Sequence, residues 1–195
     1  QAGVLLHVTS LPGPNGIGDF GPDAYSFVDW LQSAGQSLWQ WLPTTPIGPG
    51  DSPYQSVSAF AGSPLMVALE PLVAAGWLQA PQAPETGFDA LRVNFSTVVP
   101  WRLSQLRAAF AGFGLKNAAQ ERAAFEYWQK REASWLDDYA LFMALETENG
   151  GKAWWHWPAE VREREAGALG AARLRLADEI GFWAFVQWCF DTQLA

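Results

Sequence analysis

A stretch of polar and aromatic side chains at residues 51–58 carries the chemistry that stands out in this sequence. Within eight positions it offers a carboxylate, three serine hydroxyls, an amide and an aromatic ring, from Asp51, Ser52, Tyr54, Gln55, Ser56 and Ser58. Such a mixture of hydrogen-bonding groups beside a ring suits a neutral, polyhydroxylated ligand. The same residue types also build capped turns, in which Asp51 and Ser52 bond nearby backbone and Tyr54 packs in the core.

The residues around this stretch, 42–62, have the composition of a stiff loop that follows a strand. Three prolines and two glycines between positions 43 and 50 exclude a continuing helix or a central strand and fix several φ angles. Residues 37–43 (SLWQWLP) are rich in aromatic and aliphatic side chains and predict a buried strand that ends at the proline. A strand followed by a binding loop is the order of parts in an α/β barrel.

The first 42 residues predict a βαβ unit. Residues 3–7 (GVLLH) indicate a first strand, and residues 9–21 form a loop rich in glycine and proline. Pro22 and Asp23 are typical of a helix N-terminus, Gly35 is typical of a helix end, and apolar residues recur at helical spacing between them. Together with the strand near residue 38, this order predicts a parallel, right-handed unit.

After residue 62 the pattern becomes mostly helical. Residues 71–75 predict a brief helix, residues 79–99 an irregular connector, and the helical period begins at Pro100. A second helix is expected after a polar entry near Asn117. Ser134 with Asp137 resembles a capping box that starts a further helix, and a long helix follows toward Ala195.

Composition limits the classes of partner. With 49% hydrophobic and 16% charged residues, 195 residues are enough for a packed core. The net charge of -8 argues against nucleic acid or an anionic membrane surface, which are bound through positive charge. The single cysteine, Cys189, cannot form an internal disulfide, so we expect a cytoplasmic location.

Several residues leave a structural and a functional interpretation open. Twelve tryptophans are compatible with sugar binding, because indole faces stack on pyranose rings, but they also carry core burial. The tryptophans at 154, 155 and 157 around His156 indicate either a sugar platform or packing between helices. His7 and Asp19 lie either near the floor of a site or in ordinary hydrogen-bonded and capping positions. Asp137 and Asp138 point about 100° apart on a helix, which favours a structural role over a catalytic pair.

Separate blocks of this sequence resemble the opening of the 4-α-glucanotransferases, the amylomaltases or disproportionating enzymes of glycoside hydrolase family 77. They occur in the expected order and at compatible spacing: residues 3–7 (GVLLH), 9–13 (TSLPG), 16–19 (GIGD), 39–40 (WQ), 51–55 (DSPYQ) and 59–62 (AFAG). The resemblance implies an α/β fold, the N-terminal part of a (β/α)8 TIM barrel with a largely helical insertion after the second strand. It divides the chain into a first βαβ portion at 1–70, the insertion at 71–158 and a helix leading back to the barrel at 159–195.

The same resemblance implies an activity. These enzymes transfer α-1,4-glucan segments between maltooligosaccharides through a covalent glycosyl-enzyme, with retention and without a metal or organic cofactor. The carboxylate nucleophile and the acid/base lie on later strands, so we expect them beyond Ala195 and expect the 195 residues alone to be inactive. The uncapped apolar pattern at Ala195 likewise predicts an N-terminal fragment. A non-catalytic α-glucan-binding or interaction module is the alternative.

Five positions carry over as substrate-binding residues, namely Asp51, Ser52, Pro53, Tyr54 and Gln55. Tyr54 is the candidate for a ring that borders the donor sugar, and Asp51 is expected to brace the loop. His7 and Asp19 are further candidates for this site. The chain departs from many bacterial members at Pro49, where they have a tyrosine associated with a second glucan-binding groove.

Overall fold

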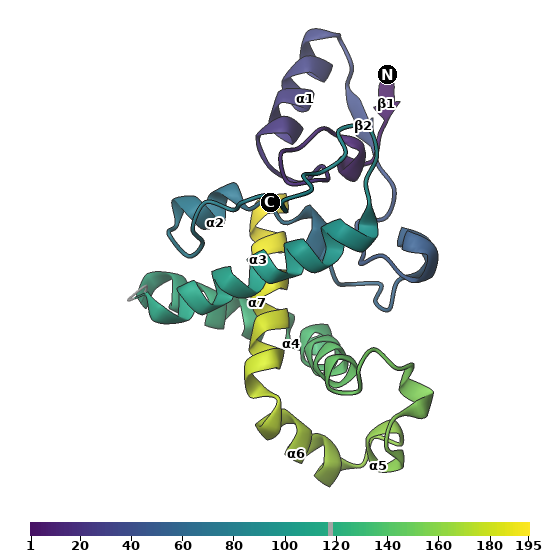
Figure 1. Cartoon of the computed structure of the whole chain (residues 1–195), viewed down its shortest axis with the longest axis vertical. Coiled ribbons are helices and arrows are strands. Elements are labelled where there is room, and N and C mark those ends of the chain that lie inside the picture. Colours follow the sequence, from purple (N-terminus) through teal and green to yellow (C-terminus); the bar gives the residue numbers. More distant parts are fainter. Residues whose placement is uncertain (117–118) are drawn as a thin grey trace. The chain divides into compact units, whose positions relative to one another are not determined.

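The computed structural model describes residues 1–116 and 119–195 and is mostly helical, with one small parallel sheet (Figure 1). Two compact units are present. The first comprises Gln1–Ala118 with Cys189–Ala195, and the second comprises Ala119–Trp188. Among the helices of the described ranges, none is long and apolar enough to cross a membrane.

The first unit opens with the predicted βαβ arrangement. Strand β1 (Gly3–Leu5) is followed by helix α1 (Pro22–Ser33) and strand β2 (Leu38–Gln40). The strands are parallel, with Gly3 opposite Leu38 and Leu5 opposite Gln40. Pro22 occupies the first helical turn and Gly35 has a φ of +70°, as the start and stop signals required. The βαβ prediction is therefore confirmed, with both strands ending earlier than expected.

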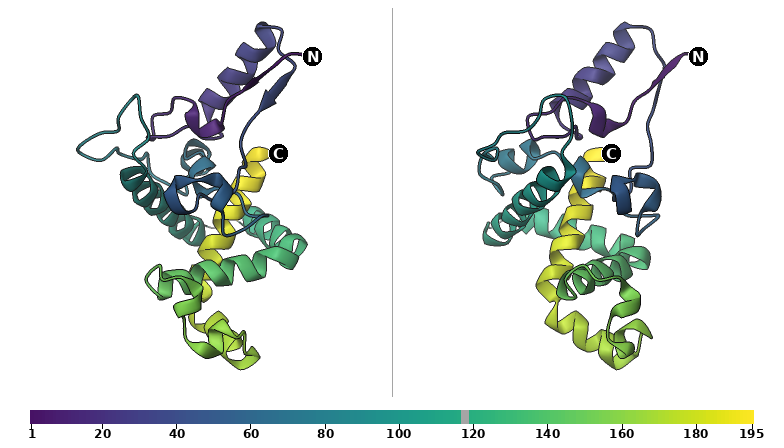
Figure 2. Two further views of the ribbon diagram at one scale, coloured as in Figure 1. Left: turned by 90° about the vertical axis from the view of Figure 1, so that its right-hand side faces the viewer. Right: turned by 45° about the vertical axis from the view of Figure 1, so that its right-hand side comes forward.

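The burial expected for the second strand is wrong. Each strand has two exposed residues around a partly buried centre. In β2 that centre is Trp39, whose indole N–H donates to the Leu6 carbonyl at 2.7 Å and whose ring lies 4.9 Å from Phe27. One aromatic contact thus fastens α1 to the sheet, and Figure 2 shows the helix running beside the strands in both views.

The segment after residue 62 forms much of the core of the first unit. It begins with the 3₁₀ turn η4 (Pro64–Met66) and continues into helix α2 (Glu70–Ala74), close to the predicted brief helix. Residues 65–69 are buried in succession, and Gly76 ends the helix with a φ of +67°. Because buried residues contact neighbours on every side, residues 65–69 hold the surrounding segments of the first unit together.

Helix α3 (Phe95–Leu115) starts earlier than the sequence predicts. Pro100 lies inside it rather than at its start, so residues 95–99 are helical and not part of an irregular connector. The physical reason is burial ahead of the proline. Val98 packs in a cluster with Ile17 and Leu65, and this contact extends the apolar face of the helix toward its N-terminus.

The second unit is built from helices. These are α4 (Ala119–Glu148), the 3₁₀ turn η5 (Trp154–His156), α5 (Ala159–Arg162), α6 (Ala166–Arg175) and α7 (Ala177–Leu194), whose last residues belong to the first unit. The expected helix start at Ser134 is wrong, because Ser134 is an exposed residue in the middle of α4 between buried Trp128 and Leu136. The expected polar entry at Asn117 lies outside the described residues.

Two helical glycines provide a test of the packing. A Cβ on Gly112 of α3 would lie 1.9 Å from the backbone oxygen of Trp77, whereas one on Gly170 of α6 would meet nothing within 4 Å. We expect Gly112→Ala to lower the free energy of unfolding by about 1–3 kcal/mol through overpacking. We expect Gly170→Ala to raise it by roughly 0.5–1 kcal/mol through helix propensity. Urea titration followed by circular dichroism measures both, and a stabilised Gly112→Ala variant would contradict the close approach.

Candidate functional site

The loop that the sequence singles out is closed at its base. The backbone N–H of Ser63 donates to the carbonyl of Thr44 at 2.7 Å, which joins the two ends of the loop. Inside it, the Thr45 hydroxyl donates to the Pro53 carbonyl at 3.0 Å, and the N–H of Gly48 donates to the Ser52 carbonyl at 3.0 Å. These bonds make the loop a defined structure, as its proline content predicts.

The tip of the loop requires unusual backbone conformations. Gly50 has a φ of +71°, and Asp51 follows with a φ of +57°, which is uncommon for a residue with a Cβ. At Gly48 a Cβ would lie 1.8 Å from the backbone oxygen of Gln55. The sequence Gly48-Pro-Gly-Asp51 therefore allows two backbone segments to approach closely across the turn.

Serine hydroxyls cap the turns on the far side of the tip. The Ser52 Oγ accepts a bond from the N–H of Tyr54 at 3.3 Å, and the Ser58 Oγ accepts from Phe60 and Ala61, both at 3.1 Å. The capped-turn interpretation is thus correct for Ser52, but its placement of Tyr54 in the core is wrong. The Tyr54 side chain is 70% exposed, and that of Phe60 is 74% exposed. The hydrogen bonds of Ser52 and Ser58 therefore fix the backbone that carries the two exposed rings, Tyr54 and Phe60.

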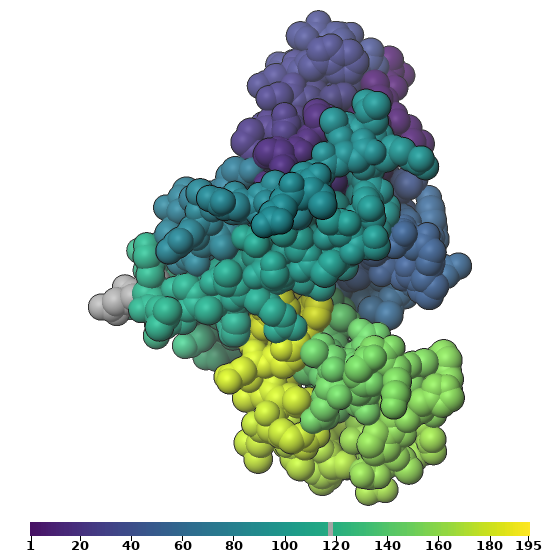
Figure 3. Space-filling model, viewed as in Figure 1, coloured from purple at the N-terminus to yellow at the C-terminus, as the bar shows by residue number. Residues whose placement is uncertain are grey.

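Asp51 also lines a cleft in the first unit. This cleft has a volume of about 510 Å³, and the segment at residues 89–96, including Asp89, Arg92 and Asn94, forms its other wall. A larger cleft of about 940 Å³ lies between that segment and the first loop, residues 9–17. Asp89, Arg92, Val93 and Phe95 line both clefts. Figure 3 shows the first loop in purple beside this teal segment on the surface.

Nothing in the sequence singles out Asp89 or Arg92. Both fall in residues 79–99, which carry no hydrophobic period and are predicted only as a connector. The Asp89 Oδ1 accepts a bond from the Leu91 N–H at 2.8 Å and so shapes the turn before Arg92. A carboxylate, an amide and a guanidinium beside the loop add hydrogen-bonding groups for a polar ligand.

His7 was expected at the end of the first strand, but β1 ends at Leu5 and His7 lies two residues beyond it. Its surroundings also differ from an ordinary hydrogen-bonded position. Its Nδ1 is buried without a hydrogen-bond partner in the described structure, and burial lowers the pKa of the imidazole below its ordinary value. His7 is not among the residues that line either cleft. Its contact with a ligand remains a prediction.

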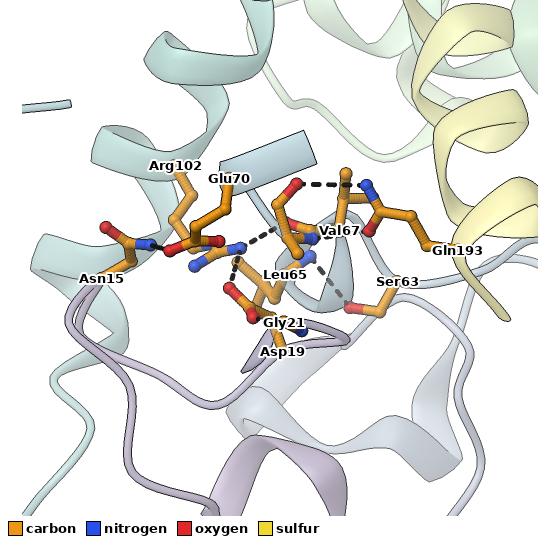
Figure 4. A network of polar contacts seen from close by, with 10 residues as sticks. Asn15, Asp19, Gly21, Ser63, Leu65, Val67, Glu70, Arg102 and Gln193 are labelled. Carbon is orange, nitrogen blue, oxygen red and sulfur yellow. Dashed lines mark hydrogen bonds and ion pairs between the residues drawn. The ribbon is translucent and has the colours of Figure 1, made fainter. Parts of the chain in front are cut away.

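Asp19 is fixed by two structural contacts, both seen in Figure 4. Its Oδ1 accepts from the N–H of Gly21 at 2.9 Å, just before α1, and its Oδ2 lies 2.9 Å from Nη2 of Arg102. The capping interpretation is therefore wrong in detail, because Oδ1 bonds the N-cap residue Gly21 itself and α1 has no side-chain cap. The other oxygen reveals an ion pair that no local pattern predicted, since 83 residues separate the partners.

Arg102 is the centre of a buried polar network. Its side chain is fully buried, and it also donates to the carbonyl of Val67. The carboxylate of Glu70 lies near enough to interact electrostatically with both charges of the pair, and its Oε1 accepts from the side-chain amide of Asn15 at 3.1 Å. Figure 4 shows how α3, the first loop and the segment 63–70 meet there.

Burial controls the electrostatics of this network. Desolvation raises the pKa of the Asp19 carboxyl, while the Arg102 guanidinium opposes that effect. The desolvation free energy of two buried charges is about as large as the free energy gained from their attraction. Such a pair therefore contributes more to the geometry of the fold than to its stability. Breaking it is different, because the remaining charge is then buried without a partner.

Comparisons with known proteins agree with the resemblance of the sequence blocks. The family model described as 4-alpha-glucanotransferase matches residues 6–195. The chain therefore belongs to the 4-alpha-glucanotransferase family. A 4-alpha-glucanotransferase of Thermus thermophilus is 47% identical over 191 residues, covering 98% of this chain and 38% of the relative. The chloroplastic/amyloplastic 4-alpha-glucanotransferase of Solanum tuberosum is 36% identical over 199 residues, covering 99% and 34%.

Solved structures give the same family. The amylomaltase from Streptococcus agalactiae in complex with acarbose is 35% identical with a TM-score of 0.92, covering 98% of this chain and 39% of that chain. The amylomaltase from Corynebacterium glutamicum, at 20% identity and a TM-score of 0.65, supports the fold alone. The chain thus spans 38% of the length of the Thermus thermophilus relative, and similar fractions of the others.

The Arg102 network predicts a large effect of a single substitution. Arg102→Met leaves the carboxylates of Asp19 and Glu70 without their buried cation, so we expect the free energy of unfolding to fall by about 3–5 kcal/mol. The triple variant Asp19→Asn, Glu70→Gln, Arg102→Met removes both charges of the pair and the neighbouring one, and it should recover part of that loss. Urea titration measures both variants. Equal stability of Arg102→Met and the parent chain would show that the pair is not buried.

His7 predicts a pH dependence of stability. Because its pKa is lowered in the folded chain, the unfolded chain binds the proton more tightly. The free energy of unfolding should therefore fall as the pH decreases through about 6.5, the ordinary value for histidine. His7→Gln should make the profile between about pH 7 and pH 5 flatter. His156→Gln, at an exposed position, is the matched control, and the same flattening in both variants would refute the assignment to His7.

Proposed function

We propose that these residues are the N-terminal part of a 4-alpha-glucanotransferase that transfers α-1,4-glucan segments between maltooligosaccharides. The likeness to the amylomaltase from Streptococcus agalactiae in complex with acarbose supports this most strongly, because it extends over 98% of the chain with a TM-score of 0.92. The relatives named for this activity are longer proteins. The proposal therefore concerns the whole protein to which the 195 residues belong.

In this proposal β1 and β2 are the first two strands of a (β/α)8 barrel. Their parallel pairing around α1 is the repeating unit of such a barrel. Residues 1–70 then form the first barrel portion, residues 71–158 a largely helical insertion, and residues 159–195 the return to the barrel. A cytoplasmic location, expected from the single Cys189, belongs to the same proposal.

The loop closed by Thr44 and Ser63 would form one wall of the substrate cleft. Its exposed Tyr54 ring suits stacking on a pyranose face, because such a face is apolar and the hydroxyls lie around its edge. Ser52 holds the Tyr54 backbone, and Asp51 lines the adjoining cleft. We keep Asp51, Ser52, Pro53, Tyr54 and Gln55 as the substrate-binding set.

The proposed reaction is a retaining double displacement. A carboxylate attacks the anomeric carbon while a second carboxyl protonates the leaving 4-oxygen, and the same group then deprotonates the incoming 4-hydroxyl. The proposal places both groups outside residues 1–195. Two of the acids within the chain are already engaged, since Asp19 is bound to Arg102 and Asp138 to Arg164. A transfer between two glucans needs neither a metal nor an organic cofactor.

A disproportionation assay on maltotriose tests the function. The 195-residue chain and the same protein carried on to its natural C-terminus are incubated in parallel with the sugar, and the products are separated by chromatography. We expect glucose and longer maltooligosaccharides from the longer protein only. Activity of the short chain would mean that the catalytic carboxylates lie within it, and inactivity of both would favour the non-catalytic glucan-binding module.

The role of Tyr54 predicts a selective effect in the longer protein. Tyr54→Ala removes one stacking surface, so the KM for maltotriose should rise roughly two- to ten-fold. Tyr127 of α4 has the same exposed fraction, 70%, and Tyr127→Ala is the matched control, expected to keep the parent KM. An unchanged KM in Tyr54→Ala would remove the loop from the substrate site.

A further inference from the structure

The second unit contains a cleft that the proposed reaction does not use. It has a volume of about 350 Å³, within the range of small-molecule sites. We call it the tryptophan cleft and define it by Asp138, Phe142, Trp154, Trp157, Val161 and Arg164. These residues come from α4, η5, α5 and the turn after α5, so the cleft is assembled from several short segments.

The floor of the tryptophan cleft is apolar and fixed. Trp157 is buried in one cluster with Leu141, Leu145 and Leu169, and its indole N–H donates to the Lys152 carbonyl at 2.7 Å. Phe142 packs against the same cluster, with its ring 5.2 Å from that of Trp157. The floor is therefore part of the core of the second unit and needs no ligand to keep its shape.

Two further tryptophans at the mouth are exposed instead. Trp154 lines the cleft and is 49% exposed, and the adjacent Trp155 is 57% exposed. Their rings are 5.9 Å apart and nearly perpendicular, at 81°. In the described part of the chain neither indole N–H has an acceptor. Exposed aromatic faces with an unused donor, next to a preformed hollow, are typical of binding surfaces.

The polar edge of the cleft carries an exposed ion pair. Nη2 of Arg164 contacts both carboxylate oxygens of Asp138, at 2.9 and 2.8 Å, and Nη2 of Arg173 lies 3.9 Å from Oδ1 of the same carboxylate. Arg164 also has a φ of +59°. Among the described residues only Asp51 shares this left-handed backbone without being glycine. Residues held in such conformations concentrate at functional sites.

We infer that the tryptophan cleft is a second binding site for a neutral α-glucan chain, held by the exposed indoles and by the hydrogen-bond donors of Arg164. This inference rests on the proposed function for the identity of the sugar. Indole faces match the apolar faces of pyranose rings, and guanidinium N–H groups match their hydroxyls. Asp138 offsets the charge of Arg164, and the net charge of -8 opposes a polyanion.

Such a site would act on long chains rather than on short ones. A polymer bound at the tryptophan cleft is held at a raised effective concentration for any other site on the same molecule. Maltotriose has three glucose rings and therefore no long chain on which such tethering could act. We therefore expect this cleft to affect the retention of amylose and to leave the disproportionation of maltotriose unchanged.

Affinity electrophoresis of the 195-residue chain tests the inference. The chain is run in native gels with and without soluble amylose, and the double variant Trp154→Ala, Trp155→Ala is run beside it. We expect the apparent dissociation constant to rise roughly five-fold or more in the double variant. Trp30→Ala in α1 is the matched control, because Trp30 is also exposed, at 54%, and should not change retention.

A second variant tests the edge of the cleft independently. Glycine adopts a positive φ without strain, so Arg164→Gly removes the guanidinium and keeps the backbone conformation. We expect it to weaken amylose retention roughly three- to ten-fold while the urea unfolding midpoint stays near that of the parent chain. Unchanged retention in Arg164→Gly would remove Arg164 from the site.

The outcomes separate this inference from the proposed function. Equal retention of the parent chain and the double variant would overturn the cleft as a glucan site, whether or not the longer protein acts on maltotriose. Equal retardation by a soluble β-glucan would overturn its specificity for α-glucan. A change in sedimentation of the double variant without a change in retention would assign the tryptophans to self-association. If the longer protein is inactive on maltotriose while retention of the chain by amylose still depends on the tryptophans, only the proposed transferase function is overturned.

Discussion

The buried guanidinium of Arg102 is the constraint on which the first unit depends. A cation without access to water needs acceptors, and here Nη2 has them in Asp19 of the first loop and in the carbonyl of Val67, while Nε and Nη1 are buried without a hydrogen-bond partner in the described structure. Helix α3 supplies the charge, so three segments far apart in the sequence must meet to provide these two acceptors. Loss of one partner therefore affects the packing of all three segments. An apolar side chain in place of Arg102 would specify the arrangement of these segments much less.

This arrangement extends to the candidate loop through the residues that follow it. Ser63 closes the loop against Thr44 and directly precedes the buried run that reaches Val67. On the next residue, Ala68, the side-chain amide of Gln193 bonds both the N–H, at 2.7 Å, and the carbonyl, at 3.1 Å. The end of α7 thus bonds the same backbone segment, Val67 and Ala68, to which Arg102 donates. The aromatic rings of the loop are held at the surface by a base that the core fixes.

The sequence predicted the elements whose signals are local. Helix α1 carries a proline at its start and a glycine at its end, and its parallel strands follow from the length of the connection. The helix start predicted at Ser134 was wrong because buried residues lie on both sides of it. Burial of Trp128 and Leu136 keeps α4 continuous through Ser134 in spite of the local capping pattern. Arg102 could not be assigned a partner, because its environment is created by segments 35 and 83 residues away. The five loop residues could be singled out by type, but the exposure of Tyr54 depends on serine caps that are equally compatible with a buried ring.

The tryptophans show why composition alone decides little about binding. Twelve indoles in one chain are compatible with a sugar-binding protein and with an aromatic core, and this chain has both exposed and buried indoles. Trp128, Trp157 and Trp183 are buried and contribute to packing. Trp154 and Trp155 belong to the same short segment as Trp157, yet they face solvent. Within this short segment, therefore, Trp157 is held by burial, whereas Trp154 and Trp155 remain exposed. The distinction lies in the partners of each ring, because the buried Trp157 indole donates to the Lys152 carbonyl, whereas Trp154 lines the cleft beside Arg164, the donor on which the proposed second site depends.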